Sequence, residues 1–99
     1  MRGMLSFLIM WLLSKKPMYG EEMAKELGKM KGDKPTPGTI YPALKQLQNN
    51  GMIASRKEGR KVIYSLTEAG QKVSNEAVEY FCVAFGPIFK EHMLLDSTV

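Results

Sequence analysis

The sequence predicts a mainly α-helical fold with one small β-hairpin. Apolar residues recur at helical spacing in several stretches, most clearly in residues 37–49. Two short runs, residues 53–58 and 61–66, read as strands, and the Gly59-Arg60 between them suits a two-residue type II′ turn. The chain has 99 residues, of which 44% are hydrophobic, so it can form one small folded domain.

Residues 37–49 form the helix around which the chain is organised. Thr36 is a good N-cap residue, because its hydroxyl can accept a backbone N–H of the first turn. Pro37 falls at the first helical position, where a missing N–H costs nothing. The i, i+4, i+7 spacing predicts one buried face, formed by Ile40, Leu44 and Leu47.

The opposite face of this helix is polar and unusual. It carries Thr39, Tyr41, Pro42, Lys45, Gln46 and Asn49. Pro42 removes the helical hydrogen bond to the Gly38 carbonyl and weakens the helix locally. An exposed tyrosine beside this weak point predicts a surface that meets a partner.

Residues 4–14 form a helix that is apolar almost all round. Leu5, Leu8, Ile9 and Leu12 make one stripe, and Met4, Phe7, Met10 and Trp11 make a second. A helix with two apolar stripes is buried on both. A single chain of this size has little material to cover both, so the second stripe predicts a dimer interface. A central core helix, or a small-molecule platform on Trp11, are the alternatives.

The remaining elements follow from shorter signals. Residues 18–20 are expected to form a turn, residues 21–30 a second helix, and residues 31–35 a polar loop. Thr67 is the expected N-cap of a last helix that runs into the 80s. Gly86-Pro87 should end or kink it near Phe85, with one further short turn at residues 89–94.

Positive charge gathers in the middle of the chain. The net charge is +4, but residues 34–66 carry six basic residues against one acidic, a net charge of +5. Residues 67–99 carry two basic against five acidic residues, a net charge of −3. Four of the bases flank the hairpin turn: Arg56, Lys57, Arg60 and Lys61. A solvated surface is the plain alternative, but this segregation favours a polyanionic partner.

Several functional classes find no support. One histidine and one cysteine make neither a zinc site nor a disulfide. No serine or cysteine lies at a catalytic spacing from the histidine, and no glycine-rich phosphate-binding loop follows a strand. We therefore expect no enzyme, no metal and no cofactor. The apolar run at residues 4–13 is too short to span a bilayer, and no cleavage site follows it, so we expect a cytoplasmic protein.

The order helix, helix, helix, hairpin, helix is that of a winged helix-turn-helix with a C-terminal dimerisation helix. Residues 36–44, Thr-Pro-Gly-Thr-Ile-Tyr-Pro-Ala-Leu, resemble the PadR family of transcriptional regulators. So do Tyr19-Gly20 with Met23, Leu47 with Gly51-Met52-Ile53, and Tyr64-x-Leu66-Thr67-x-x-Gly70. The resemblance covers residues 4–72. The short C-terminal region is similar to that of the small subfamily.

The resemblance implies a homodimeric DNA-binding repressor. Residues 1–67 would form the DNA-binding domain, and residues 68–99 a dimerisation helix. The resemblance places the start of the third helix, including Thr39, Tyr41 and Pro42, against double-stranded DNA, for which we expect an inverted-repeat operator. Together with the exposed helix face and the basic hairpin, the predicted DNA-binding residues are Tyr19, Pro37, Gly38, Thr39, Tyr41, Pro42, Lys45, Arg56, Lys57, Arg60 and Lys61. The dimer interface would use Met4, Phe7, Met10, Trp11, Tyr80, Phe81, Phe85 and Ile88.

The sequence departs from the family pattern at two places, and two other functions are compatible with parts of it. The hairpin turn is very short, and the one tryptophan, Trp11, lies on the first helix, so drug binding between tryptophans of the last helix is not carried over. A sensor whose small-molecule effector sits between the first and last helices is compatible with DNA binding. The alternative is a protein-interaction winged helix that binds no DNA, against which the +5 segment argues.

Overall fold

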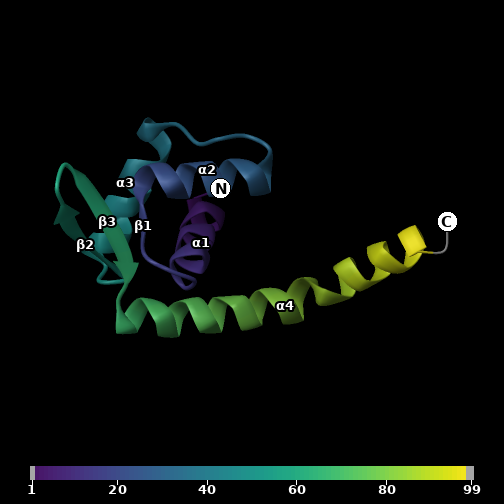
Figure 1. The fold of residues 1–99 in the computed structure, drawn as a ribbon. Coiled ribbons are helices and arrows are strands. Elements are labelled where there is room, and N and C mark those ends of the chain that lie inside the picture. Colours follow the sequence, from purple (N-terminus) through teal and green to yellow (C-terminus); the bar gives the residue numbers. More distant parts are fainter. Residues whose placement is uncertain (1, 98–99) are drawn as a thin grey trace.

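Seven elements follow one another in the computed structural model, which describes residues 2–97 (Figure 1). They are α1 (Arg2–Leu13), β1 (Met18–Tyr19), α2 (Gly20–Lys31), α3 (Pro37–Asn49), β2 (Ile53–Glu58), β3 (Lys61–Leu66) and α4 (Glu68–Ser97). The expected helices and hairpin are confirmed. The expected DNA-binding domain, residues 1–67, and the expected dimerisation helix, residues 68–99, both extend past the described residues, at residue 1 and at residues 98–99.

The hairpin has a third strand beside it. β3 lies in the middle of an antiparallel sheet in the order β1-β3-β2, with Met18 opposite Tyr64 and Tyr19 opposite Ile63. The turn expected at residues 18–20 is therefore wrong. Met18 is buried, and its burial holds the extended segment against the free edge of β3, whose backbone groups it satisfies. At the hairpin turn Gly59 has a φ of 65°, as expected for a turn with glycine first.

The hydrophobic core lies between α1, α2, α3 and the base of the hairpin. Its most deeply buried apolar side chains are Ile9, Met23, Leu27, Ile40, Leu44 and Ile53. The predicted buried face of α3 is confirmed, because Ile40, Leu44 and Leu47 all belong to this core. Side chains on the other face of α3 are exposed. The core therefore fixes which face of α3 meets solvent.

The last helix is longer than expected. Thr67 caps it as predicted, since the Gly70 N–H donates to the Thr67 hydroxyl at 3.0 Å. Of the two outcomes expected near Phe85, an end is wrong, because α4 continues through Gly86-Pro87; the helix bends in this part instead, as Figure 1 shows. Pro87 has no N–H to donate to the Val83 carbonyl, and Val83 is a residue that is 73% exposed, on a part of the helix open to solvent.

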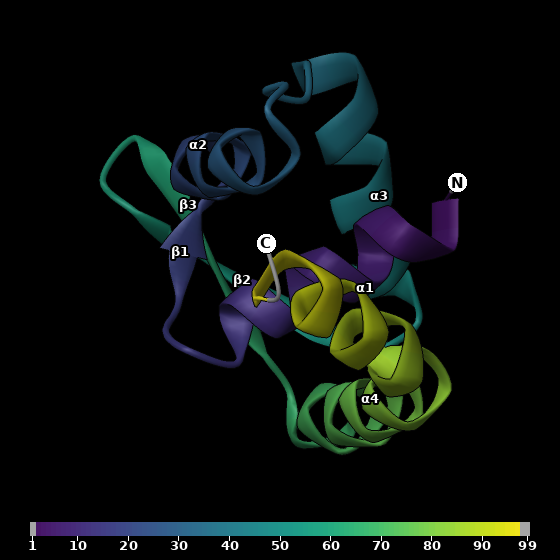
Figure 2. The ribbon, with the colours of Figure 1, turned by 90° about the vertical axis from the view of Figure 1, so that its right-hand side faces the viewer.

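This helix determines the shape of the molecule. α4 passes beneath α1, as the view along its axis in Figure 2 shows, and its C-terminal half then leaves the body (Figures 1 and 2). The molecule is consequently elongated, with extents of 52 × 27 × 22 Å.

Candidate nucleic-acid interface

The first turn of α3 is closed by backbone contacts and by a pair of hydroxyls. The N–H groups of Thr39 and Ile40 both donate to the Thr36 carbonyl, at 2.9 and 3.0 Å. The expected hydroxyl cap is wrong, since the Thr36 side chain makes no cap bond to the backbone. Its hydroxyl instead lies 3.2 Å from that of Thr39, which competes for it. Both threonines are exposed, so two hydroxyls stand at the solvent end of α3.

The predicted contact residues of α3 form one continuous surface. All six are exposed, namely Pro37, Gly38, Thr39, Tyr41, Pro42 and Lys45. Space around Gly38 is open, since the nearest atom to a Cβ placed there would be the Thr36 hydroxyl oxygen at 3.9 Å. The structure thus brings these residues together on the face that the core leaves free.

Tyr41 lies against the start of α2. A Cβ placed on Gly20 would come within 2.7 Å of the Tyr41 hydroxyl oxygen and 3.0 Å of its ring. The absence of a side chain at Gly20 therefore makes room for Tyr41. The tyrosine nevertheless remains 45% exposed, so it combines contact with the body and access to solvent.

A cleft of about 400 Å³ separates Tyr41 from the hairpin. It lies between the start of α2, α3 and β3, and it is lined by Tyr19, Gly20, Glu21, Glu22, Lys25, Tyr41, Arg60, Lys61, Val62 and Tyr64. Burial raises the pKa of Tyr64, and so to a smaller extent does the neighbouring Tyr41. The cleft is therefore a tyrosine-walled groove with cations at its hairpin side.

The two carboxylates of this cleft are compensated from outside it. Lys34 Nζ lies 2.7 Å from Glu21 Oε1, and this ion pair lowers the pKa of Glu21. Lys16 Nζ lies 3.9 Å from Glu22 Oε2. Neither lysine lines the cleft. Within the lining, Lys25 also helps to lower the pKa of Glu21, so the cations left to attract an anion are Arg60 and Lys61 at the hairpin side.

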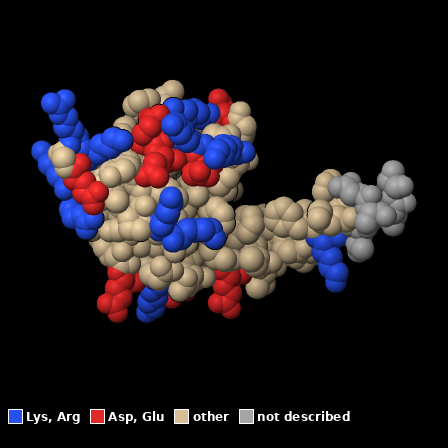
Figure 3. Space-filling view, viewed as in Figure 1, with Lys and Arg blue, Asp and Glu red and all other residues tan. Residues whose placement is uncertain are grey.

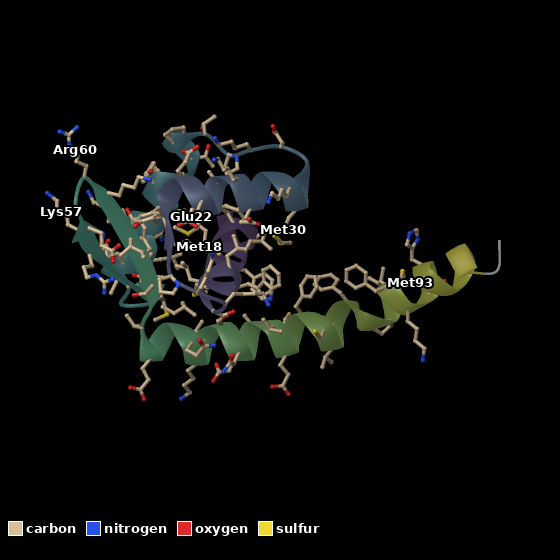
Figure 4. All side chains as sticks on the ribbon, in the orientation of Figure 1. Met18, Glu22, Met30, Lys57, Arg60 and Met93 are labelled. Atoms are coloured by element: carbon tan, nitrogen blue, oxygen red, sulfur yellow. The ribbon has the colours of Figure 1, made fainter. Side chains whose placement is uncertain are left out.

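The hairpin, β2 and β3, is the wing, and its tip is basic. Figure 3 shows lysine and arginine side chains gathered over this end of the molecule, and Figure 4 shows Lys57 and Arg60 pointing away from the body. All four predicted bases are exposed. One of them is already engaged, because Arg56 Nη2 donates to Glu58 Oε2.

Tyr19, which is predicted to bind DNA, is half-buried and contacts the wing. Its hydroxyl donates to Glu58 Oε1 at 3.1 Å, and the Lys61 ammonium lies 5.0 Å from the centre of its ring. This places Tyr19 between the body and the wing. Sequence reasoning missed Glu58, Gly20 and Lys25. The two-residue alternation of β2, which puts Arg56 and Glu58 on one side, was the available signal for Glu58.

The predicted dimer residues fall into two groups. In the first group, Met10 is buried in the core of the protomer. Trp11 is half-buried, with Lys15 Nζ 4.4 Å from the centre of its ring. The rings of Phe7 and Phe81 stack with their centres 5.6 Å apart. The remaining four are more open to solvent, with exposures of 37% for Met4, 74% for Tyr80, 41% for Phe85 and 62% for Ile88. The second group lies on α1 and α4.

Within the described residues, no three histidine, cysteine, aspartate or glutamate side chains come together as metal ligands would. None of the helices in residues 2–97 has the length and apolar character needed to cross a membrane.

Residues 9–76 match the model of the transcriptional regulator PadR-like family. The chain belongs to this PadR-like family. Members of this family are transcriptional regulators with a winged-helix fold. The chain therefore has the fold of a DNA-binding protein. No match was found among curated proteins.

Solved structures of PadR-like regulators share the fold over most of their length. A PadR-like transcription factor from Bacteroides fragilis is 26% identical, with a TM-score of 0.78 over 90% of each chain. A transcriptional regulator from Clostridium thermocellum is 28% identical, with a TM-score of 0.75 over 90% of each chain. A PadR family regulator from Eggerthella lenta is also 28% identical, with a TM-score of 0.74 over 90% of this chain and 81% of that chain.

Proposed function

We propose that this PadR-like protein is a repressor that binds operator DNA as a homodimer, with α3 in the major groove and the wing on phosphate. The observation that carries the proposal is the exposed face of α3 beside a cationic cleft and a basic wing. The PadR-like family membership supplies the class of activity. A regulator of this kind acts where the DNA is, so the proposal includes a cytoplasmic location.

The surface of α3 suits a DNA groove. A major groove about 12 Å wide admits one helix, whose first residues then reach the base edges. Thr39 offers a hydroxyl, Lys45 a charge, and Tyr41 both a hydroxyl and an apolar ring face. The cleft beside α3 has room for the sugar-phosphate backbone that borders the groove, and Arg60 and Lys61 would compensate its charge.

A second copy of the chain would cover the apolar surface of α4. Ile88, Phe89 and Met93 are each more than half exposed, and they lie within about 140° of one another on a helix that extends beyond the body. Contiguous apolar surface of this kind marks a protein–protein interface. Two-fold pairing would present two copies of α3, so the operator would be an inverted repeat with half-sites about 34–36 Å apart.

Release of the DNA is assigned in this proposal to a small-molecule effector. The candidate surface is the aromatic row of Phe7, Phe81 and Phe85 between α1 and α4, where neighbouring ring centres lie 5.6 and 4.8 Å apart. A planar apolar compound would add to such a row by stacking.

Selection from a random duplex library tests the proposal directly. Wild-type protein at about 150 mM salt, with competitor DNA, is expected to enrich an inverted repeat. Thr39→Ala with Lys45→Ala should abolish the enrichment, whereas Lys72→Ala, which removes an exposed lysine from α4, should leave it intact. Failure of the wild type to retain any duplex would exclude DNA binding and favour the protein-interaction module.

A further inference from the structure

The outer part of the wing is tied to the body through Tyr19. β3 pairs with β1 only at Ile63 and Tyr64, so residues 57–62 extend beyond the last strand pairing with the body. Among the described residues, one side-chain hydrogen bond joins the body to this outer part, from the Tyr19 hydroxyl to Glu58 Oε1. The Lys61 ammonium over the same ring adds a second contact.

Tyr19 is itself fixed by its neighbours. Its backbone N–H donates to Glu22 Oε1 at 3.0 Å at the start of α2, and its strand pairs with β3. Met18 beside it is buried in the core. The side chain therefore starts from a rigid point at the junction of α2 and the sheet.

We propose that Tyr19 is a positioning residue for the wing, and that its hydrogen bond to Glu58 holds the wing tip at a set distance from α3. This inference rests on the proposed function and assigns Tyr19 a role in placing the DNA-binding parts instead of touching DNA. Tyr19 and Lys61 both line the cleft, so the bond also sets the width of the groove beside α3.

The inference explains why a basic wing contains a carboxylate. Residues 53–66 hold four bases and a single acidic residue, Glu58, which would repel phosphate. Each of its two oxygens has a donor, since Oε1 accepts from Tyr19 and Oε2 accepts from Arg56. Glu58 thus joins the wing to the body on one side and orients an arginine on the other.

The consequence for DNA binding is specific. A selected operator must engage α3 and the wing at once, so a wing that swings freely loses the benefit of joint binding. Random DNA needs only phosphate contacts, which a mobile wing still makes. Loss of the bond should therefore lower the affinity for selected DNA and leave the affinity for random DNA unchanged.

Matched variants separate the hydroxyl, the acceptor and the charge. Tyr19→Phe keeps the ring beneath Lys61 and removes only the hydroxyl. Glu58→Gln keeps an acceptor oxygen and removes the charge, whereas Glu58→Ala removes both. In DNA-free protein, backbone amide order parameters for residues 57–61 should fall in Tyr19→Phe and Glu58→Ala and hold in Glu58→Gln. The amides of α2 and α3, and the melting temperature, should not change.

The DNA measurements use the duplex selected by the wild type and a random-sequence duplex of equal length. Tyr19→Phe should weaken binding to the selected duplex about three- to tenfold, with random-duplex binding within twofold of wild type. Unchanged order at residues 57–61 would overturn the inference. Equal losses on both duplexes would also overturn it, since they would make Tyr19 a phosphate contact. The order parameters need no DNA, so a failure of the proposed function appears separately, as absent binding by the wild type.

Discussion

At Gly70, α4 packs closely against the segment that precedes the hairpin. A Cβ at this position would lie 1.9 Å from the Met52 carbonyl oxygen and 2.9 Å from Leu66 Cδ2. The nearer atom belongs to the backbone, so it has little freedom to move. We expect Gly70→Ala to lower the free energy of unfolding by about 3 kcal/mol, at the upper end of overpacking costs.

Urea unfolding measures this cost, and a second glycine of α4 provides the control. Gly86 has no atom within 4 Å of its would-be Cβ. Gly86→Ala should therefore stabilise the helix by roughly 0.5–1 kcal/mol. Equal midpoints for the two variants would contradict the close approach at Gly70.

Tyr41 gives the second prediction at this scale. Tyr41→Phe keeps the ring that lies on Gly20 and removes the hydroxyl, worth about 0.5–1.5 kcal/mol in one hydrogen bond and more to a phosphate. We expect a several-fold loss of affinity for the selected duplex and an unchanged melting temperature. A lower melting temperature with intact DNA affinity would assign Tyr41 to the fold and move recognition to Thr39, Lys45 and the wing.

These residues also show what the sequence could and could not predict. Helical spacing predicted the burial of Ile40, Leu44 and Leu47, because periodicity is a property of the chain itself. The contacts of Gly20 with Tyr41 and of Gly70 with Met52 join segments that are distant in the sequence, so no local pattern reports them. The Thr36 hydroxyl followed the N-cap preference in position but took the Thr39 hydroxyl as its partner.

At the scale of elements, the wing supplies affinity through charge. Each phosphate contact removed should reduce the slope of log K against log salt by about 0.9 on duplex DNA. Arg60→Ala with Lys61→Ala is therefore expected to lower the slope by about 2, measured on the random duplex between 50 and 200 mM salt. Lys29→Ala with Lys72→Ala is the charge-matched control and should leave the slope in place. A slope unchanged in the wing variant would mean that the tip stays in solvent.

The bond between wing and body has a defined pH range. Its Arg56 and Tyr19 donors lower the pKa of Glu58, while Glu58 raises the pKa of Tyr19. The ionised Glu58 carboxylate stabilises the folded state above its unfolded pKa of about 4.3. This stabilisation is lost as the pH falls through the lower pKa that Glu58 has in the folded state. The protonated Tyr19 hydroxyl stabilises the folded state below its unfolded pKa of about 10. This stabilisation is lost as the pH rises through the higher pKa that Tyr19 has in the folded state.

Carboxyl and ring NMR titrations check these directions. Tyr19→Phe should move the Glu58 pKa part of the way back toward its ordinary value, because Arg56 remains its first partner. A Glu58 pKa that is the same in the variant and the wild type would contradict the hydrogen bond.

Two elements differ from their sequence signals for physical reasons. Met18-Tyr19 is too short to show strand periodicity, and only the free edge of β3 makes it a strand. Gly86-Pro87 predicts an end or a kink of the helix, and at the solvent-exposed Val83 the lost bond is tolerated, so α4 bends and continues to Ser97 (Figure 1). In both cases the deciding partner, another strand or the solvent, lies outside the local sequence.

At the scale of the whole molecule, α4 separates two kinds of apolar surface. Near the body Phe81 stacks on Phe7 of α1, and Ser74 on the same helix is buried. Beyond the body the helix keeps its apolar character, with Ile88 and Phe89 more than half exposed. The sequence predicted excess apolar surface on α1 and α4, but it could not divide that surface between the protomer core, which holds Met10, and the free part of α4.

That division allows a cleaner test of the proposed homodimer than a substitution on α1. Ile88→Glu places a charge on a side chain that is 62% exposed in the protomer, so it costs the protomer fold little. In a dimer the same charge would enter an apolar interface, where burial without a partner is strongly unfavourable. Lys90→Glu is the control, because Lys90 is exposed and two residues away, about 160° round the helix from Ile88. Sedimentation at micromolar concentration should show a dimer for the wild type and for Lys90→Glu, and an 11.1 kDa species that keeps its helical circular dichroism for Ile88→Glu. A monomeric wild type would remove the second copy from the proposal and with it the expectation of an inverted-repeat operator.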